Sequence, residues 1–402
     1  MTAYDLVTVG GGIGGSALAK VMAESGYRAL IVEREPRYRD RVRGEFMFPW
    51  GVADAQQLGL YDAFVRAGAH HPTYWTDFAG PDALPPRDFA EDTPQKVRGL
   101  CLYHPRLQEA ALEAALAAGA DVRRGARVLA VEPGAKPTIV VEDGGERITV
   151  STRLAVGADG RASMMRKWGG FDVEEEPPGN IVAGVLVEGV STSPESSICM
   201  LNPSMSRMAL YFPQTSSSGR AYLASRSADG VRVHGEGGFD VFLRECAESG
   251  LADWVLDGAR QAGPLATFEG AGSWVDHPHK NGVALVGDAA ATNDPTWGQG
   301  LSCTLRDARL LRDALLADED WDAAGDAYAD AHDRCFEKVR TAESWFTQVF
   351  LEPGPRGDAL REHVLPQLPT DPLFMPDTLF SGPDFAPPTE EHRSRIFGPV
   401  GL

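Results

Sequence analysis

Short apolar runs alternate with segments of helical periodicity near the start of the chain, and this alternation predicts an α/β fold. Residues 4–9 form an apolar run that predicts a buried parallel strand. In residues 16–25 the apolar side chains recur at helical spacing, and Gly26 stands where such a helix would end. Similar apolar runs predict further buried strands over residues 28–32, 153–157 and 282–286.

The periodicity changes in the middle of the chain, where four short strands are separated by Pro, Ser and Gly. They cover residues 181–187, 198–201, 208–212 and 221–225. This pattern predicts an antiparallel sheet on a separate lobe, with one face shielding a pocket. Helices are predicted over residues 106–118, 239–261, 300–315 and 321–350, and the Pro- and Gly-rich stretch from residue 352 is expected to be mostly irregular.

The first glycine-rich turn carries the strongest chemical signal. Gly10 would permit the tight turn, Gly12 would let the backbone approach a pyrophosphate, and Gly15 would let helix and strand pack closely. Free N–H groups at the helix start attract phosphate charge. Glu33 ends the second strand about 20 residues further on, where an acid accepts ribose hydroxyls. Its charge would repel a 2′-phosphate, so the turn predicts a dinucleotide with a bare adenosine ribose.

Other charged residues flank the predicted strand ends. Arg34 and Arg43 lie in a basic loop beside the dinucleotide site, and Arg106 begins a helix where it could meet a second phosphate. Asp159 lies in an Asp-Gly turn after one buried strand, and Asp288 follows another. Open α/β sheets bind ligands at such carboxyl ends, so both turns are expected to face the ligand.

Composition narrows the function classes. The 402 residues carry a formal net charge of −19, which disfavours nucleic acid and anionic membranes as partners. No apolar run approaches the roughly 20 residues that span a bilayer, and we expect no signal peptide, since the basic and apolar segments typical of one are not seen before the first predicted strand. The five cysteines are scattered without a CxxC motif, so we expect reduced thiols in a cytoplasm and no metal site.

Three segments, namely residues 9–16 with Glu33, residues 157–166 and residues 282–307, together resemble the class A flavoprotein monooxygenases of the para-hydroxybenzoate hydroxylase-like group. The resemblance implies a Rossmann-like FAD-binding domain interrupted by an antiparallel-sheet substrate domain, with long C-terminal helices. It implies non-covalent FAD, NAD(P)H as a transient co-substrate, and O₂ activated as a flavin C4a-hydroperoxide. The reaction would hydroxylate or epoxidise an aromatic or other bulky apolar molecule, such as a natural-product intermediate.

The same resemblance implies roles for individual residues. The cofactor would contact Gly10, Gly12, Gly15, Glu33, Arg34, Arg43, Arg106, Asp159, Asp288, Pro295, Gly298, Gly300 and Leu301. FAD-binding segments would cover residues 1–75, 101–179 and 276–318, substrate-binding segments 76–100 and 180–275, and a helical region with an irregular tail 319–402. Two positions depart from the family pattern, because Ala291 stands where His is common and Ser302 where Asn is common.

The sequence leaves several alternatives open. A flavin-dependent halogenase and a geranylgeranyl-reductase-type oxidoreductase share the scaffold, although the halogenases' paired-tryptophan signature is missing. No residue stands out as a catalytic base, His104 is interpreted as structural, and both monomer and homodimer remain open. The apolar residues expected to line a substrate pocket are Phe46, Phe48, Met208, Tyr211, Phe212 and Trp297.

Overall fold

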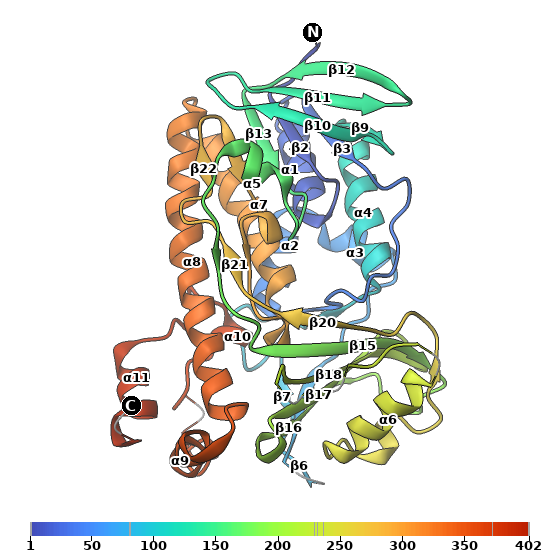
Figure 1. Ribbon diagram of the computed structural model, residues 1–402, viewed down its shortest axis with the longest axis vertical. Helices are drawn as coiled ribbons and strands as arrows, with labels where there is room; N and C mark the ends of the chain where they lie inside the picture. The colour runs from blue at the N-terminus through green and yellow to red at the C-terminus, as the bar shows by residue number, and fades with distance from the viewer. Residues whose placement is uncertain are drawn as a thin grey trace.

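The computed structural model describes residues 2–79, 82–228, 230, 232–235, 237–371 and 373–400, and every candidate site residue lies within these ranges. A six-stranded sheet forms the upper half of the molecule, with strand order β22-β23-β13-β2-β3-β9 (Figure 1). Its strands are β2 (Leu6–Val9), β3 (Ala29–Glu33), β9 (Asp121–Arg124), β13 (Leu154–Gly157), β22 (His279–Lys280) and β23 (Val283–Leu285). All neighbours are parallel except the edge strand β22.

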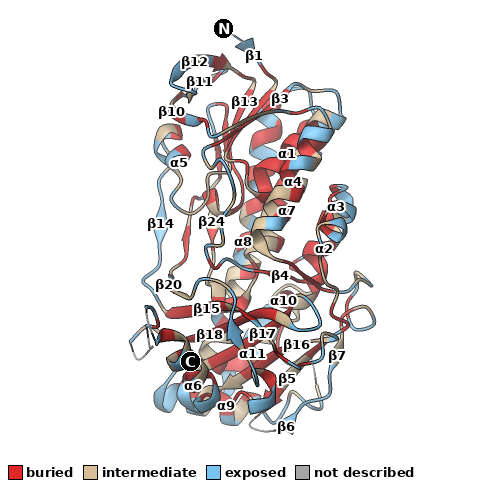
Figure 2. Ribbon diagram, turned by 90° about the vertical axis from the view of Figure 1, so that its right-hand side faces the viewer, coloured by how far each residue is buried: buried red, intermediate tan, exposed pale blue. Residues whose placement is uncertain are grey.

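Both faces of this sheet are covered, which explains why its central strands are buried along their whole length and are mostly apolar (Figure 2). One face packs on the helices α1 (Ile13–Glu24), α4 (His104–Ala117) and α7 (Gly300–Ala317). Alternate side chains, such as Val7 and Leu30, turn to the other face. There they meet a second sheet made of β1 (Thr2–Ala3), β10 (Arg127–Glu132), β11 (Thr138–Asp143) and β12 (Glu146–Ser151).

A nine-stranded sheet forms the lower half of the molecule. It contains β5 (Tyr74–Ala79), β6 (Asp82–Ala83), β7 (Arg87–Asp88), β15 (Asn180–Glu188), β16 (Ser196–Asn202), β17 (Arg207–Pro213), β18 (Ser218–Arg226), β19 (Arg260–Gln261) and β20 (Ala266–Gly270). The four strands expected from the sequence are its central members and pair antiparallel. Strands β5 and β20, which flank this set, are not predicted by the pattern.

The prediction of one helix over residues 239–261 is wrong in its second half. Helix α6 (Gly238–Glu248) ends where Gly250 adopts φ +95°, a left-handed conformation that terminates helices. A short 3₁₀ turn (Asp253–Val255) and strand β19 follow. Helix α6 packs on one face of the large sheet, so the other face is available for a pocket.

The C-terminal helices are confirmed in part. Helix α8 (Trp321–Phe350) has the expected bounds and runs past both large sheets (Figure 1). The tail is not mostly irregular, because it forms α9 (Gly354–Val364), α10 (Thr378–Ser381) and α11 (Glu390–Phe397). It folds against the large sheet and buries Leu360, Val364 and Leu379 almost completely. Helices this short depend on tertiary packing, which a local pattern does not report.

Shorter elements connect these layers. They are β4 (Phe46–Met47), α2 (Pro49–Gln57), α3 (Tyr61–Arg66), β8 (Leu100–Cys101), α5 (Met164–Gly169), β14 (Glu174–Glu175), β21 (Ser273–Trp274) and β24 (Ala291–Thr292). Within the described residues, no helix has the length and apolar character needed to cross a membrane. The mixed α/β class with C-terminal helices is thus confirmed, and the domain boundaries stay predictions.

Candidate active site

The three turns singled out in the sequence lie side by side. Strand β13 pairs in parallel with β2 on one side and with β23 on the other, so Gly157 is opposite both Val9 and Leu285. The amide of Ala158 donates to the Val9 carbonyl at 2.8 Å, and the amide of Val286 donates to the Gly157 carbonyl at 2.9 Å. The turns that follow these strands therefore meet at one edge of the sheet, where open α/β sheets bind ligands.

The first turn has the shape that a pyrophosphate requires. A Cβ on Gly10 would lie 2.3 Å from the carbonyl oxygen of Ala158, and one on Gly15 would lie 2.1 Å from the carbonyl oxygen of Gly10. At Gly12 the nearest side-chain atom would be 3.9 Å away, so space remains for a ligand against the backbone. Helix α1 begins without a side-chain cap, which leaves its first N–H groups for an anion. The residues present therefore fit the dinucleotide part of FAD.

Glu33 supports this turn from the end of β3. Its two carboxylate oxygens accept the amides of Gly11 and Glu35, each at 2.7 Å. The hydroxyl of Tyr38 donates to the Gly11 carbonyl, which holds the turn from a second direction. Because a carboxylate has about four acceptor sites, Glu33 keeps capacity for ribose hydroxyls while it orders the turn.

The second turn uses its aspartate locally. Asp159 accepts hydrogen bonds from the Ser163 hydroxyl at 2.6 Å and the Met164 amide at 2.7 Å, so its carboxylate orders the start of α5. Arg166 on α5 then reaches the third turn, where it donates to the carbonyls of Ala289 at 2.7 Å and Asp288 at 3.1 Å. Arg166 thus ties the second turn to the third, a role that the sequence pattern did not reveal.

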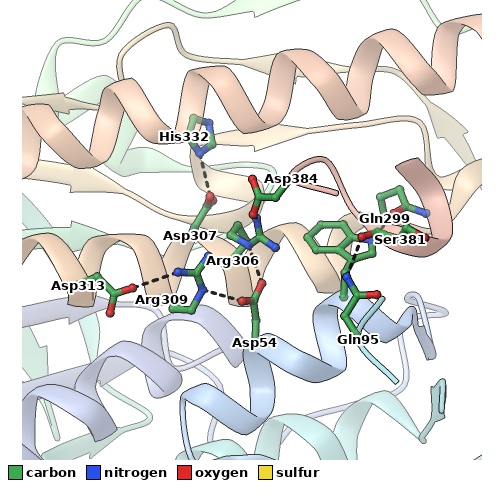
Figure 3. A network of polar contacts seen from close by, with 11 residues as sticks. Asp54, Gln95, Gln299, Arg306, Asp307, Arg309, Asp313, His332, Ser381 and Asp384 are labelled. Carbon is green, nitrogen blue, oxygen red and sulfur yellow. Dashed lines mark hydrogen bonds and ion pairs between the residues drawn. The ribbon is translucent and has the colours of Figure 1, made fainter. Parts of the chain in front are cut away.

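The third turn is held from behind by a buried pair (Figure 3). The carboxylate of Asp307 on α7 accepts the Gly287 amide at 2.8 Å and contacts Nδ1 of His332 at 2.9 Å. Burial opposes a positive charge on His332, but the charge and hydrogen bond of Asp307 outweigh it and raise the pKa of His332. This buried, hydrogen-bonded pair under the turn therefore fixes the backbone next to Asp288.

Arg43, His104 and Asp288 meet at the open side of the third turn. Nη1 of Arg43 lies 3.9 Å from Oδ2 of Asp288, and Nδ1 of His104 contacts the Gly44 carbonyl at 3.0 Å. Burial raises the pKa of Asp288, against the opposing charge of Arg43. Burial also lowers the pKa of His104 to about 4, so this ring is neutral at physiological pH. His104, which the sequence analysis interpreted as structural, therefore lies beside the third turn as a neutral ring in contact with the loop that carries Arg43.

The remaining cofactor candidates are spread more widely. The side chain of Arg34 is largely exposed, and its Nε lies 3.8 Å from Oε1 of Glu35. Arg106 is exposed, with Nη1 3.6 Å from the position of a Cβ on Gly68. Pro295 and Gly298 border the cavity described next, whereas Gly300 begins α7 without a side-chain cap and Leu301 packs on the core beneath it.

A cavity of about 1100 Å³ lies between the large sheet, the Gly44–Glu45 loop, the Pro295–Gly298 turn and the tail. Five of the six expected pocket residues line it: Phe46, Phe48, Met208, Phe212 and Trp297. Tyr211 does not, which corrects the expectation for this residue. Successive residues of a strand face opposite sides, so Phe212 faces the cavity while Tyr211 packs with α6 and is fully buried.

Several cavity residues escaped the sequence analysis. Trp75, Asp77 and Arg87 come from strands β5 and β7, which had no clear pattern. The tail supplies a further wall through Leu365, Leu368, Met375, Asp377, Leu379 and Phe380. The guanidinium of Arg87 binds both carboxylate oxygens of Asp377, at 2.5 and 2.7 Å, and lies 4.3 Å from the centre of the Phe380 ring. This ion pair holds the tail against the nine-stranded sheet.

Comparison with known proteins identifies a family and several relatives that this chain resembles. A family described as FAD binding domain matches residues 3–343. Rifampicin monooxygenase of Streptomyces venezuelae is 26% identical over 88% of this chain and 73% of its own length. Squalene monooxygenase of Mus musculus is 26% identical over 78% of this chain and 55% of its own length, so the chain spans about half of that relative. CmlS, a flavin-dependent halogenase, superposes with a TM-score of 0.74 at 20% identity, covering 93% of this chain and 70% of its own.

The fold and the three converging turns define a flavoprotein oxidoreductase. The chain belongs to the FAD-binding domain family, and the expectation of a class A, FAD-dependent monooxygenase is confirmed. The likeness to the halogenase rests on structure at low identity and shows the shared fold alone.

Proposed function

We propose that the protein inserts one oxygen atom from O₂ into a large apolar or polycyclic aromatic molecule, by hydroxylation or epoxidation, with NAD(P)H as the reductant. The observation that carries this proposal is the 1100 Å³ cavity, which adjoins the turns expected to hold the flavin ring and is lined by aromatic side chains. Its volume lies slightly above the range of about 300–1,000 Å³ that is typical of small-molecule pockets. The monooxygenation of rifampicin and squalene by relatives, according to their names, supports a bulky substrate.

The glycine cradle, Glu33 and Asp288 would hold FAD, with Arg43 beside the flavin. When bound and reduced, the cofactor supplies the activated oxygen, and the chain supplies position and shelter from water. The loop that carries Arg43 is fixed by a buried ion pair, because Arg220 binds Glu45 through two nitrogens at 2.9 Å each. The Tyr222 hydroxyl also donates to the Arg43 carbonyl at 2.6 Å. These contacts would hold the flavin edge of the cavity in one geometry.

Asp77 places a carboxyl group in the wall of this otherwise apolar cavity. Its Oδ1 accepts the indole N–H of Trp75 at 2.9 Å, and burial raises the pKa of its carboxyl. Whether ionised or protonated, this carboxyl retains acceptor capacity toward the cavity. We infer that the substrate carries a hydroxyl or amine that donates to Asp77, in addition to its bulky apolar part.

The test uses the purified, FAD-loaded chain with NADH or NADPH and a panel of phenols and polyketides of graded size. The expected result is oxygen consumption with products one oxygen atom heavier, and preference for large rings over small polar acids. Products that gain a halogen would support the halogenase alternative, and products that gain two hydrogens would support the reductase alternative. Turnover of small polar acids alone would contradict the proposed substrate class.

A further inference from the structure

We propose that the protein has a second ligand site, remote from the flavin turns, which binds a divalent transition-metal ion such as Zn²⁺. Its ligands would be Nε2 of His277, Nδ1 of His279 and Oδ1 of Asp326. The two histidines flank Pro278 in the segment that enters edge strand β22, and Asp326 lies on α8. The three residues offer ligand atoms that all lie within 4.8 Å of one another. Two imidazoles and a carboxylate are a ligand set that suits zinc and related ions.

The two distances from the histidine nitrogens to Asp326 are close to those of a tetrahedral site. Ligands bound at about 2.0–2.1 Å lie about 3.3 Å apart. Nε2 of His277 is 3.2 Å from Oδ1 of Asp326, and Nδ1 of His279 is 2.8 Å from the same oxygen. The side chain of Asp326 is 59% exposed and that of His277 is 43% exposed, so a small rotation can open the shorter distance. The same exposure gives the ion a path from solvent.

The nitrogen of each histidine that would not bind metal faces a further carboxylate. Nε2 of His279 lies 3.8 Å from Oδ1 of Asp322, and Nδ1 of His277 lies 3.6 Å from Oδ1 of Asp330. Metal-binding histidines commonly direct their other N–H at a carboxylate, which fixes the tautomer and strengthens the ligand. Both carboxylates lie just beyond hydrogen-bond distance and are exposed, so each would need only a small movement to accept the N–H of a metal-bound ring.

His279 supplies an independent observation. Its side chain is only 1% exposed, and its Nε2 has no hydrogen-bond partner within the described part of the chain. If Nδ1 carries the proton shared with Asp326, the Nε2 lone pair faces the carboxylate of Asp322, an unfavourable contact. A metal on Nδ1 places the proton on Nε2, so that an N–H rather than a lone pair faces the Asp322 carboxylate at 3.8 Å. The metal would therefore satisfy a buried nitrogen that is otherwise left unpaired.

The fold also makes room for this ring. A Cβ on Gly325 of α8 would lie 2.4 Å from Nε2 of His279, so the imidazole lies directly on the helix at a glycine. Glycine is unfavourable inside a helix, and here it permits the close approach. The metal would fasten the segment before β23 to α8.

The experiment uses the full, FAD-loaded chain with any affinity tag removed, stripped with a chelator and then dialysed against Zn²⁺. The variants are His277→Ala and Asp326→Asn, both at partly exposed positions, with Glu337→Gln as an exposed, charge-matched control on the same helix. Bound zinc is measured by elemental mass spectrometry, and the unfolding midpoint is measured with and without Zn²⁺ or Mg²⁺.

We expect one zinc per chain in the parent protein and the control, with a rise in the unfolding midpoint that Mg²⁺ does not produce. Each ligand variant should lose affinity for zinc by about tenfold or more while it keeps its FAD content. Absence of stoichiometric zinc in the parent protein would overturn the proposal. Equal zinc binding by the ligand variants would overturn it as well, because the ion would then bind elsewhere.

Discussion

Replacing Asp54 with Asn should destabilise the protein strongly, because this carboxylate is the shared partner of the buried Arg306 and the largely buried Arg309 (Figure 3). Its Oδ2 accepts Nε of Arg306 at 2.7 Å, and its Oδ1 accepts Nε of Arg309 at 2.6 Å. The side chain of Asp54 is 2% exposed, and those of the arginines are 7% and 15% exposed. These ion pairs join α2 to α7. Their loss should therefore loosen the packing of α7, the helix that carries Asp307 under the third turn.

The expected loss in the free energy of unfolding depends on which partners the two arginines keep after the substitution. Removing one member of a buried ion pair costs about 3–5 kcal/mol, because the other charge stays buried without its partner. Arg306 would keep Asp384 at 2.5 Å and Arg309 would keep Asp313 at 3.0 Å, and both of these carboxylates are about half exposed. These partners offset part of the loss, so we expect about 3 kcal/mol, at the lower end of this range.

The assay is denaturant unfolding of Asp54→Asn and of Asp313→Asn as a matched control. The control removes a partly exposed partner of the same Arg309 and should cost less than about 1 kcal/mol. Flavin content before unfolding shows that each variant starts folded. A loss below about 1 kcal/mol for Asp54→Asn, or equal losses for the two variants, would refute the reasoning.

Three further predictions concern the cofactor turn, the cavity and pH. Asp288→Ala should lose FAD while far-ultraviolet circular dichroism stays unchanged, and full flavin absorbance would show that this residue does not hold the cofactor. Phe212→Ala should weaken substrate binding, measured by flavin absorbance changes, whereas Tyr211→Phe should not, since its buried hydroxyl has no partner in the described chain. The raised pKa of His332 means that its pair with Asp307 contributes fully below about pH 6.5 and less as the pH rises through the folded-state pKa. His332→Asn should flatten that part of the unfolding profile, and an unchanged slope would exclude the pair as its cause.

The convergence of the three turns could be predicted from the sequence because backbone rules dominate there. Gly10 and Gly15 have no room for a side chain, and the strands before the turns are buried on both faces, so local sequence and tertiary structure impose the same residues. Asp288 could be placed because it directly follows such a strand. What the pattern could not give was the support behind the turn, since Asp307 and His332 come together only through the packing of α7 on α8.

The substrate side was less predictable for physical reasons. Phe46 and Trp297 could be proposed because they adjoin recognisable turns, but any aromatic residue in a strand can face either side of the sheet. Tyr211 was expected to line the cavity, but it is next to Phe212 in the same strand and therefore faces the opposite side of the sheet. The tail wall could not be found at all, since Leu379 and Phe380 lie in a helix of four residues that is held by Arg87 from far away in the sequence.

The tail wall has a consequence for how this enzyme can change. The turns proposed to hold FAD lie before residue 308, while one side of the cavity is lined by described tail residues between Leu365 and Phe380. If the cavity receives the substrate as proposed, substitutions in that short stretch would alter which molecules are accepted without changing the turns proposed to hold the cofactor. Selection for new substrates, in nature or in the laboratory, has a natural starting point there.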